Sequence, residues 1–593
     1  MDSLKDLGAG RLDGRQVTLA PRAAGKGSPV PGSESAPLRG HPALRFGEPL
    51  LVFLLAILVR RVGLSAQPPH ADDLYHFYAA RSYLADGSFS IFSGSYERAK
   101  DFTWLVATSM RFFGETLEAA RLPSLMASAI LVAAVYVWMR REAGRGPALI
   151  AAGMLTLLRP VMDTSTLIRF YAIQSLLFWM GGALIYRVLV TGRANLAALV
   201  ALAVAGLALA EAARLQFVSL IGLVGLAAWA AGFLTWRLRR SVSARVLAAA
   251  WVSALAAGAV LLLLLVKLGV ASHLLEIYRS AAVWALENRD NYLFYYHTLA
   301  VNFGLLVDFL PLATLAAVVF FPRPALLCAS LLFFGLILHS FGGMKDERYI
   351  AYLLPYFACL WGLAAWPLVA GLRDRVAAFG REVLGQGRWD RAMPGIATAL
   401  VAVLGAALVM KAVPVLDGTV KEFVRANYHR PTLEREWSWR TNRQALRHLA
   451  GQSEVFIVDD DLSADLNVAR ADIVLNISRL QENRPPEEFV RDFRTGTPTI
   501  SSADSIRAVV ACFSSGAIVS TEWFLSWLDA DARGVLAEHE RVAMPAPPLV
   551  AYVWHTPGGA ADARAGQDCG RIRQLVAATA AGRRSALTAE SRR

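Results

Sequence analysis

Residues 49–77 read PLLVFLLAILVRRVGLSAQPPHADDLYHF, an apolar run that gives way to a polar and acidic segment. The apolar part, 49–66, is long enough to cross a hydrocarbon core about 30 Å thick as a helix. Two adjacent carboxylates, Asp72 and Asp73, follow a few residues later. The stretch therefore predicts a membrane span that leads into a loop with acidic groups at the membrane face.

Similar apolar runs recur along the chain and predict a polytopic α-helical membrane protein with about 11 transmembrane helices. The predicted spans are 49–66, 118–138, 147–162, 170–190, 196–213, 215–236, 246–267, 299–321, 324–341, 349–371 and 394–416. Charged residues make up only 18% of the chain, whereas soluble proteins carry about 25%. The composition thus argues against a disordered chain and against a wholly cytosolic enzyme.

Arginines in every alternate linker contribute to the formal net charge of +13. They are Arg140, Arg141, Arg145, Arg187, Arg193, Arg237, Arg239, Arg240, Arg245, Arg373, Arg375, Arg381, Arg388 and Arg391. Cytoplasmic loops of membrane proteins are rich in Lys and Arg, so the charge needs no nucleic-acid partner, and none is predicted. The pattern predicts a plasma (inner) membrane protein with a cytoplasmic N-terminus. Arg60 and Arg61 end the first span, and at least one should face protein or a lipid phosphate.

Composition divides the chain into four expected regions. Residues 1–45 are predicted to be a disordered cytoplasmic tail, and 46–416 a transmembrane domain with a long first outer loop at 67–117. Residues 417–556 are predicted to form an α/β domain outside the membrane, and 557–593 a flexible tail.

The outer position of this domain follows from an odd number of spans after a cytoplasmic N-terminus. Its α/β class is predicted from short β-rich runs that alternate with helical stretches. The expected strands are 455–458, 473–476, 508–512, 518–521 and 549–554. The acidic cluster 459–461 is expected to be a solvated turn after a strand, with a cation or acceptor site as the alternative. Cys512 and Cys569 could pair in an oxidising compartment, but the sequence leaves this open.

Several short motifs lie near the expected outer ends of the spans. They are Arg60-Arg61-Val-Gly63-Leu64, Asp72-Asp73, the nonapeptide from Glu97 to Leu105, Ala120-Arg121-Leu122-Pro123-Ser124, and Arg348-Tyr349 followed by Pro355. In this order they resemble the membrane glycosyltransferases with the GT-C fold. The resemblance is closer to the branch that holds protein O-mannosyltransferases and the lipid A aminoarabinose transferase (family 39-like). It implies a GT-C-like domain in which the loop 67–117 is catalytic.

The resemblance implies a role for the acidic pair. In that family an Asp-Glu pair opens the first outer loop, and its first Asp is the catalytic base. Asp72 occupies this position, and Asp73 replaces the Glu. Taken alone, two adjacent aspartates would more simply begin a helix. Many members have a second Asp where this chain has Tyr171, so the sugar and acceptor preferences of the branch do not carry over.

A divalent metal is the one cofactor that the resemblance suggests. In aminoarabinose transferases a metal has been associated with the glutamate of a nonapeptide in this loop and with a histidine in a later outer loop. Glu97 matches that glutamate, and His297 is the positional candidate for the histidine. An interfacial histidine in an aromatic belt is the alternative for His297.

The implied chemistry needs a base and fixed cations. An acceptor hydroxyl must lose its proton to a carboxylate, which Asp72 can supply. The departing lipid phosphate needs cations at the membrane face, and arginine binds phosphate with two parallel hydrogen bonds. The phosphate-binding candidates are Arg348, Lys345, Arg98 and Arg169, with Glu97, Tyr171 and Tyr349 as supporting residues. Each cation could instead face lipid headgroups, and Lys345 could snorkel.

We therefore expect an inverting membrane glycosyltransferase. It would move a sugar from a polyprenyl-phosphate donor to a hydroxyl of a cell-envelope acceptor (a glycan, a lipid or a protein). A secondary transporter or a lipid-linked sugar flippase is the alternative, and a non-catalytic sugar- or lipid-binding protein is a third. Transporters place ionisable residues near mid-span, whereas the acidic residues here gather in outer loops.

Overall fold

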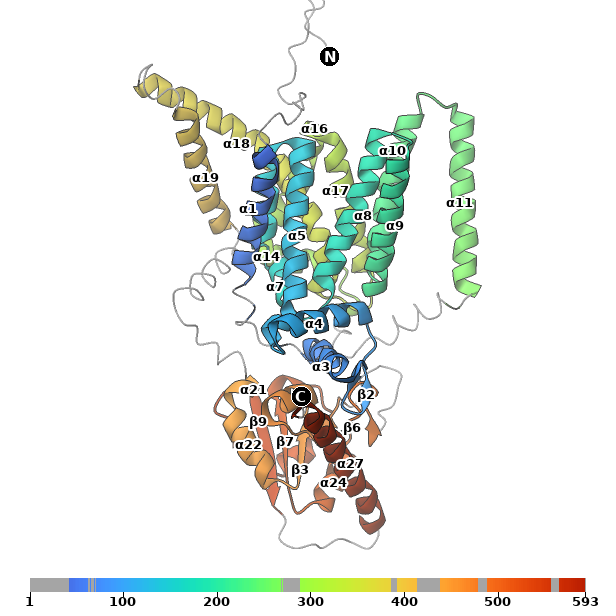
Figure 1. The fold of residues 1–593 in the computed structure, drawn as a ribbon, viewed down its shortest axis with the longest axis vertical. Helices are drawn as coiled ribbons and strands as arrows, with labels where there is room; N and C mark the ends of the chain where they lie inside the picture. The colour runs from blue at the N-terminus through green and yellow to red at the C-terminus, as the bar shows by residue number, and fades with distance from the viewer. Residues whose placement is uncertain are drawn as a thin grey trace, which may run out of the picture.

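The computed structural model describes residues 42–61, 64, 69, 71–267, 269, 288–384, 392–412, 438–477, 488–555 and 565–591. Figure 1 shows a bundle of long helices, a thin layer made by α3 and α4, and an α/β domain beyond that layer. Most of the tail expected over 1–45 lies outside the described residues, as do 413–437 and 557–564.

Six helical segments of the described chain are long and apolar enough to cross a membrane. They are α5 (Leu117–Ala143), α8 (Tyr171–Thr191), α9 (Leu196–Leu215), α10 (Ser219–Leu238), α17 (Pro322–Ser340) and Glu347–Glu382, which joins the 3-10 helix η1 (Glu347–Leu353) to α18 (Leu354–Leu384). Figure 1 also places α1 (Pro42–Arg60), α11 (Ala244–Lys267) and α19 (Met393–Ala412) in or beside the bundle. Helix α6 (Arg145–Leu157) packs against α5 and α18. The polytopic α-helical prediction is confirmed, but the number of 11 spans is not.

Some expected spans are broken into shorter helices. The span expected at 299–321 consists of α14 (Phe294–Phe303), α15 (Leu305–Asp308) and α16 (Leu310–Phe320). Gly304 has a φ of 49°, which a continuing α-helix excludes and which glycine adopts readily. Pro311 then lies in the first turn of α16, where its missing N–H costs no hydrogen bond.

Close packing of small residues holds the bundle together. A Cβ atom on Gly222 of α10 would lie 2.5 Å from the Tyr352 ring and 2.6 Å from the Phe178 ring. Because lipid is as apolar as the helices themselves, such van der Waals contact is a main driving force for their association.

Arg60 is fully buried in the bundle. Its Nε donates to Ser128 Oγ at 2.9 Å, and its Nη2 donates to the Leu155 carbonyl at 3.1 Å. The prediction that one arginine of the 60–61 pair faces protein is confirmed.

The first outer loop forms the thin layer. It contains α3 (Ala71–Asp86), a hairpin of β1 (Ser90–Ile91) and β2 (Gly94–Ser95), and α4 (Lys100–Phe113). The two helices lie across the end of the bundle (Figure 1). Phe77, Phe102 and Phe170 are buried in one apolar cluster, which joins the layer to the start of α8.

The α/β domain is built on a seven-stranded sheet with the order β5-β6-β4-β3-β7-β9-β8. The strands are β3 (Val455–Val458), β4 (Ile473–Leu475), β5 (Val490–Arg491), β6 (Pro498–Ile500), β7 (Ser515–Thr521), β8 (Glu540–Ala543) and β9 (Leu549–His555). Strands β6, β4, β3 and β7 are parallel, and the edge strands pair antiparallel. The helices are α21 (Ser438–Thr441), α22 (Arg443–Gln452), α23 (Asp461–Val468), α24 (Ala503–Cys512), α25 (Glu522–Ser526), α26 (Ala530–Ala537) and α27 (Ala565–Ser591). The predicted α/β class is confirmed.

The expected strand at 508–512 is wrong, because these residues end helix α24. Ser502 caps the helix by accepting a hydrogen bond from the Ser505 N–H at 3.2 Å. Ile506 and Val509 are then buried at helical spacing.

The flexible tail expected at 557–593 is also wrong for its described part, which forms helix α27. Cys569, Ile572 and Val576 are buried in the same apolar cluster as α24. A disulfide joins Cys512 of α24 to Cys569 of α27, so the pairing that the sequence left open is present in the structure.

The acidic cluster 459–461 is not a solvated turn. Asp459 accepts hydrogen bonds from Ser520 Oγ at 2.9 Å and the Thr521 N–H at 2.8 Å. Asp460 caps α23, and Asp461 is only 6% exposed. The three carboxylates are therefore part of the domain's packing.

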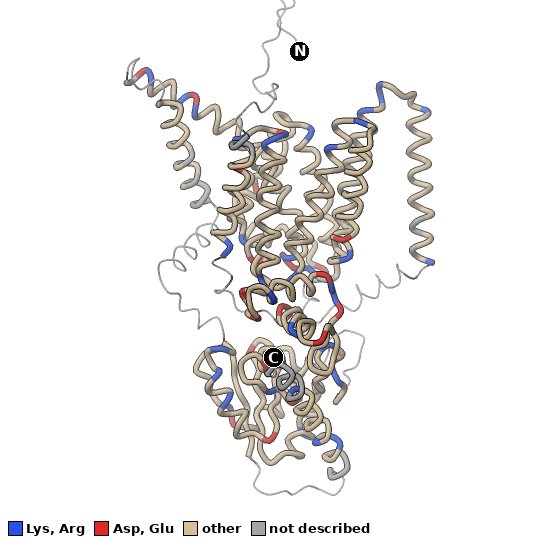
Figure 2. The backbone as a smooth tube through the Cα atoms, in the orientation of Figure 1, with Lys and Arg blue, Asp and Glu red and all other residues tan. Residues whose placement is uncertain are grey.

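The two ends of the bundle differ in charge. Figure 2 shows many Lys and Arg residues with a few acidic ones at the end remote from the α/β domain, and charges of both signs at the end beside α3 and α4. The second end is the only one of the two that also adjoins the α/β domain (Figure 1).

Candidate active site

The candidate site is built around the carboxylate of Asp72, in the first turn of α3. Its Oδ2 lies 3.2 Å from Nη1 of Arg348 and 3.5 Å from Nη2 of Arg169. These arginines come from η1 and from the linker between α7 (Arg159–Thr166) and α8. The fold thus brings three distant segments together at the base of the bundle, with Asp72 still one-third exposed.

Arg169 is fixed from several sides, and its side chain is only 3% exposed. Its Nη1 donates to the Asp72 carbonyl and to the Tyr96 hydroxyl, both at 3.3 Å. Its own carbonyl accepts from Ser124 Oγ at 2.9 Å. Arg169 is therefore a rigid cation that holds the start of α3 as well as its carboxylate.

Arg348 is more accessible, with 23% of its side chain exposed. Its Nε lies 3.0 Å from Asp346, so the guanidinium bridges two carboxylates. Its central carbon lies 5.9 Å from the ring centre of Tyr171 and 5.8 Å from that of Tyr349. The two predicted supporting tyrosines thus flank the predicted phosphate-binding arginine.

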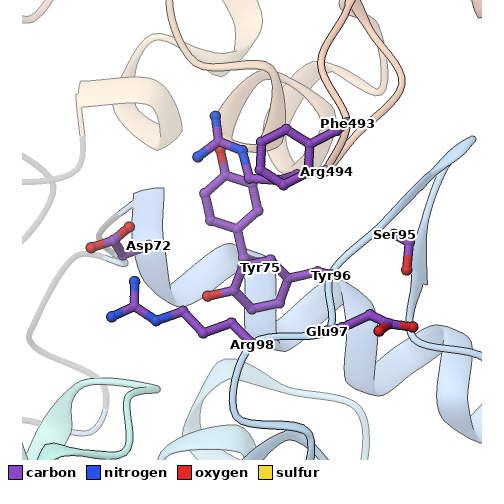
Figure 3. Close-up of a pocket in the computed structure, with 8 residues that line it drawn as sticks. All are labelled: Asp72, Tyr75, Ser95, Tyr96, Glu97, Arg98, Phe493 and Arg494. Atoms are coloured by element: carbon purple, nitrogen blue, oxygen red, sulfur yellow. The ribbon is translucent and has the colours of Figure 1, made fainter. Parts of the chain in front are cut away.

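A cavity of about 520 Å³ opens beside Asp72. It is lined by Asp72, Tyr75, Ser95, Tyr96, Glu97 and Arg98 from the outer loop and by Phe493 and Arg494 from the α/β domain. Figure 3 shows Asp72 and Arg98 facing the same space, with Phe493 and Arg494 entering from the other side. The cavity therefore lies between the two parts of the chain.

No protein-family model matches the chain, and no curated protein sequence does either. Solved structures do match. ArnT from Cupriavidus metallidurans bound to undecaprenyl phosphate is 16% identical, with 86% of this chain and 98% of that chain covered and a TM-score of 0.52. The apo state of the same protein gives 15% identity, the same coverage and a TM-score of 0.50.

The chain has the GT-C fold. The archaeal oligosaccharyltransferase AglB from Archaeoglobus fulgidus, solved with an inhibitory peptide and a dolichol-phosphate, also matches, at 12% identity. The match covers 84% of this chain and 73% of the AglB chain, with a TM-score of 0.48. The match to ArnT confirms the predicted resemblance to GT-C proteins at the level of the fold.

Within this GT-C chain, Asp73 is placed differently from Asp72. Asp73 is fully buried and interacts electrostatically with Arg121 of α5. Arg121 in turn donates from Nη1 to the Leu64 carbonyl at 2.5 Å. Asp73 therefore does not reach the cavity, and its predicted place beside Asp72 in the catalytic pair is not supported.

Lys345 does not face the site as a phosphate ligand. It is only 8% exposed, and its Nζ donates to the Asn288 carbonyl at 2.7 Å and to the Arg289 carbonyl. Burial lowers the pKa of its ammonium group. The predicted phosphate-binding role is corrected, because this amine ties residues 288–289 to the loop before η1.

Arg98 and Glu97 both lie at the cavity and are exposed. Arg98 donates from Nη2 to Gln216 Oε1 at 3.2 Å and lies over the Phe170 ring at 5.4 Å. Glu97 pairs with Lys100 at 3.1 Å. Arg98 can therefore meet a ligand in the cavity, and Glu97 adds a carboxylate to its rim.

The candidate metal ligands gain no support. His297 is exposed on α14, with its ring 5.6 Å from that of Tyr296. The described part of the chain holds no group of three or more His, Cys, Asp or Glu side chains that could bind a metal ion. Glu97 and His297 thus do not form part of such a cluster.

Sequence reasoning missed three residues that shape the site. Tyr75 stacks on Tyr96 with ring centres 5.1 Å apart, and Phe493 and Arg494 reach the cavity from another domain. Tyr75 lies three residues after Asp72, so helical spacing could have placed it on the same face. Nothing in the local sequence signals the approach of the other two.

His76 supports the layer from within. It is fully buried, its Nδ1 is 2.9 Å from Thr103 Oγ1, and its ring meets Tyr96 and Phe102 edge to face. Burial, followed by the charges of Arg169 and Arg98, lowers the pKa of this imidazole well below its usual value of 6.5. His76 is therefore neutral in the folded protein.

We predict that His76 contributes to acid sensitivity. The unfolded chain binds a proton on His76 near pH 6.5, whereas the folded chain does not, so stability falls as the pH drops below that value. For one proton, the free energy of unfolding falls by up to about 1.4 kcal/mol per pH unit. His76→Gln should therefore reduce the fall in the thermal midpoint between about pH 6.5 and 5. His297→Gln, at an exposed site, should keep the parent's slope. Identical slopes in the parent and in His76→Gln would contradict the assignment.

Proposed function

We propose that this protein is a membrane glycosyltransferase that moves a sugar from a polyprenyl-phosphate donor to a hydroxyl group of a cell-envelope acceptor. One observation carries the proposal: a partly exposed carboxylate, Asp72, faces a cavity while two arginines contact its other side. The GT-C fold, shared with ArnT, agrees with it. The ArnT structure holds undecaprenyl phosphate.

Asp72 acts as the general base. Its carboxylate takes the proton from the acceptor hydroxyl, and the oxygen attacks the anomeric carbon of the donor sugar. The bond from that carbon to the phosphate oxygen breaks, and the electron pair leaves with the phosphate. A single displacement of this kind inverts the anomeric centre.

Arg348 and Arg169 stabilise the departing phosphate. Charge-assisted hydrogen bonds from guanidinium to phosphate are short and strong, and they act best where charge develops in the transition state. Arg169 is too enclosed to move, whereas Arg348 is partly exposed and shared between Asp72 and Asp346. Donor binding therefore draws Arg348 from Asp72 to the phosphate, and this frees the carboxylate to accept a proton.

The donor and the acceptor approach Asp72 from different sides. The arginines come from segments that end or begin membrane helices, so the lipid phosphate arrives from the bundle. The cavity lies toward the α/β domain, so it suits the acceptor (a glycan, a lipid or a protein). The end of the bundle remote from the α/β domain is rich in Lys and Arg (Figure 2), which under the positive-inside rule supports a cytoplasmic position for that end and an outer position for the α/β domain at the plasma (inner) membrane.

Removing the base should stop transfer. Asp72→Asn keeps the size of the side chain but cannot take a proton, so the release of free polyprenyl phosphate from a labelled lipid-linked sugar should fall on the order of 10²- to 10⁴-fold. Asp86→Asn, at the exposed other end of α3, is the matched control and should react like the parent. A flippase or transporter would move the lipid without this cleavage. Unchanged release by folded Asp72→Asn protein would refute the role of Asp72.

Replacing the mobile arginine should weaken phosphate binding. Arg348→Lys keeps the charge but loses the second parallel hydrogen bond, so affinity for undecaprenyl phosphate should fall about tenfold and turnover should fall with it. Titration in detergent, read by intrinsic fluorescence, measures the affinity. Arg111→Lys, at the exposed end of α4, controls for a general effect of the exchange. Parent-like titration by Arg348→Lys would mean that the phosphate binds elsewhere.

A further inference from the structure

The last helix of the chain carries a charged residue into the junction between the α/β domain and the outer loop. Arg583 of α27 is only 4% exposed. Figure 1 shows the C-terminal end of α27 rising toward α3. A fully charged side chain is rarely buried unless it is paired, so its partners identify what it holds.

Arg583 contacts three separate segments. Its Nη1 lies 3.3 Å from Asp465 and its Nη2 lies 3.4 Å from Asp461, both on α23. Its Nη2 also donates to Thr497 Oγ1 at 3.0 Å, just before β6. The guanidinium carbon lies 4.2 Å from the ring centre of Phe92, in the turn between β1 and β2. One side chain therefore joins α27, α23, the β5–β6 turn and the outer loop.

One branch of this network leads to the helix that carries Asp72. Asp465 Oδ1 pairs with Arg583, and its Oδ2 accepts a hydrogen bond from the Tyr78 hydroxyl at 2.9 Å. Tyr78 is buried on α3, one turn after Tyr75, which lines the cavity. Arg583 thus acts on α3 through a carboxylate and a tyrosine.

The other branch leads to the cavity wall that the α/β domain supplies. Thr497 donates from Oγ1 to Asp461 at 2.6 Å. Its carbonyl accepts from the Asp492 N–H at 2.9 Å, and this bond closes the turn 492–497. Within this turn Asp492 accepts from the Arg494 N–H at 2.8 Å and from its Nη2 at 2.8 Å. The guanidinium carbon of Arg494 lies 4.7 Å from the ring centre of Tyr75. The turn therefore presents Arg494 across the cavity from Asp72.

The turn 492–497 and the turn of the outer-loop hairpin fit each other without spare room. The Ser95 N–H donates to the Phe493 carbonyl at 3.1 Å. A Cβ atom on Gly94 would lie 2.4 Å from the Arg494 backbone, and one on Gly496 would lie 1.9 Å from Ser93 Oγ. Only glycine permits this approach at both positions, so small displacements of either turn change the cavity.

The base of α27 is fixed independently. The Cys512–Cys569 disulfide joins it to α24, and Arg573 donates from Nε and Nη2 to the Cys512 carbonyl at 3.0 and 2.7 Å. Helix α27 is thus held at one end by covalent and polar bonds to the sheet domain. Its other end delivers Arg583 to the junction.

We propose that Arg583 is a positioning residue that seats the 492–497 turn on the outer loop and so sets the acceptor wall of the cavity, formed by Phe493 and Arg494. What the wall does in transfer rests on the proposed function. The seating itself depends only on the contacts of Arg583. Donor binding should be unaffected, because in the described part of the chain Arg169 and Arg348 pair with Asp72 and Asp346, whereas Arg583 pairs with Asp461 and Asp465.

Hydrogen–deuterium exchange of the full chain in lipid nanodiscs tests the seating. Arg583→Ala removes every contact, and Arg583→Lys keeps the charge but cannot span two carboxylates and a hydroxyl. Both should speed exchange about tenfold or more in peptides covering 90–96 and 490–497, with the smaller effect for Lys. Arg571→Ala, on the exposed side of the same helix, should exchange like the parent.

Two further measurements separate a positioning role from a general loss of fold. The affinity of the Arg583 variants for undecaprenyl phosphate should lie within about twofold of the parent's, because Arg169 and Arg348 are unchanged. If Arg583→Ala fails to fold, Thr497→Val removes the same link with a side chain of equal shape and should loosen the same peptides. Parent-like exchange in 90–96 and 490–497 for both variants would overturn the proposal. These outcomes do not depend on whether Asp72 is the catalytic base.

Discussion

The rest of the site depends on one interaction, the contact of the Asp72 carboxylate with Arg169 and Arg348. A partly exposed ion pair contributes only about 0–1 kcal/mol to stability, so this pairing is a poor explanation for folding. The contact instead fixes the positions of the Asp72 carboxylate and the two guanidinium groups at the boundary between the apolar bundle and the α/β domain. Arg348 is shared between Asp72 and Asp346, so an incoming phosphate competes with two carboxylates for this arginine.

The layered architecture follows from that constraint. A carboxylate that acts as a base must be within reach of the acceptor hydroxyl, whereas a lipid phosphate is held at the membrane face. Helix α3 lies across the end of the bundle, so Asp72 meets arginines from the helix ends on one side and the cavity on the other. The α/β domain closes that cavity with Arg494 stacked on Tyr75. Neither part of the chain forms the site alone.

Sequence reasoning recovered the membrane bundle and the outer-loop helices, because each leaves a local pattern of apolar runs or charges. It also singled out Asp72 and Arg348, which the fold brings into contact. It could not separate Asp72 from Asp73, since neighbours on a helix point about 100° apart and only packing decides which faces the cavity. Lys345 looked like a phosphate ligand because its carbonyl partners at 288 and 289 are distant in sequence. The sequence gives no sign of the roles of Phe493, Arg494 and Arg583, because each contacts an outer-loop residue that lies hundreds of positions earlier in the chain. Helix α27 was missed because its apolar positions are few among Ala, Gly and Arg.

The central claim is that Arg348 passes from Asp72 to the donor phosphate. A cryo-electron microscopy structure of the full chain with undecaprenyl phosphate tests it most directly. The account predicts a phosphate within hydrogen-bond reach of the Arg348 guanidinium, and an Asp72–Arg348 separation longer than the about 4 Å limit of an ion pair. A phosphate bound at another site, with the Asp72–Arg348 contact still at 3.2 Å, would contradict it.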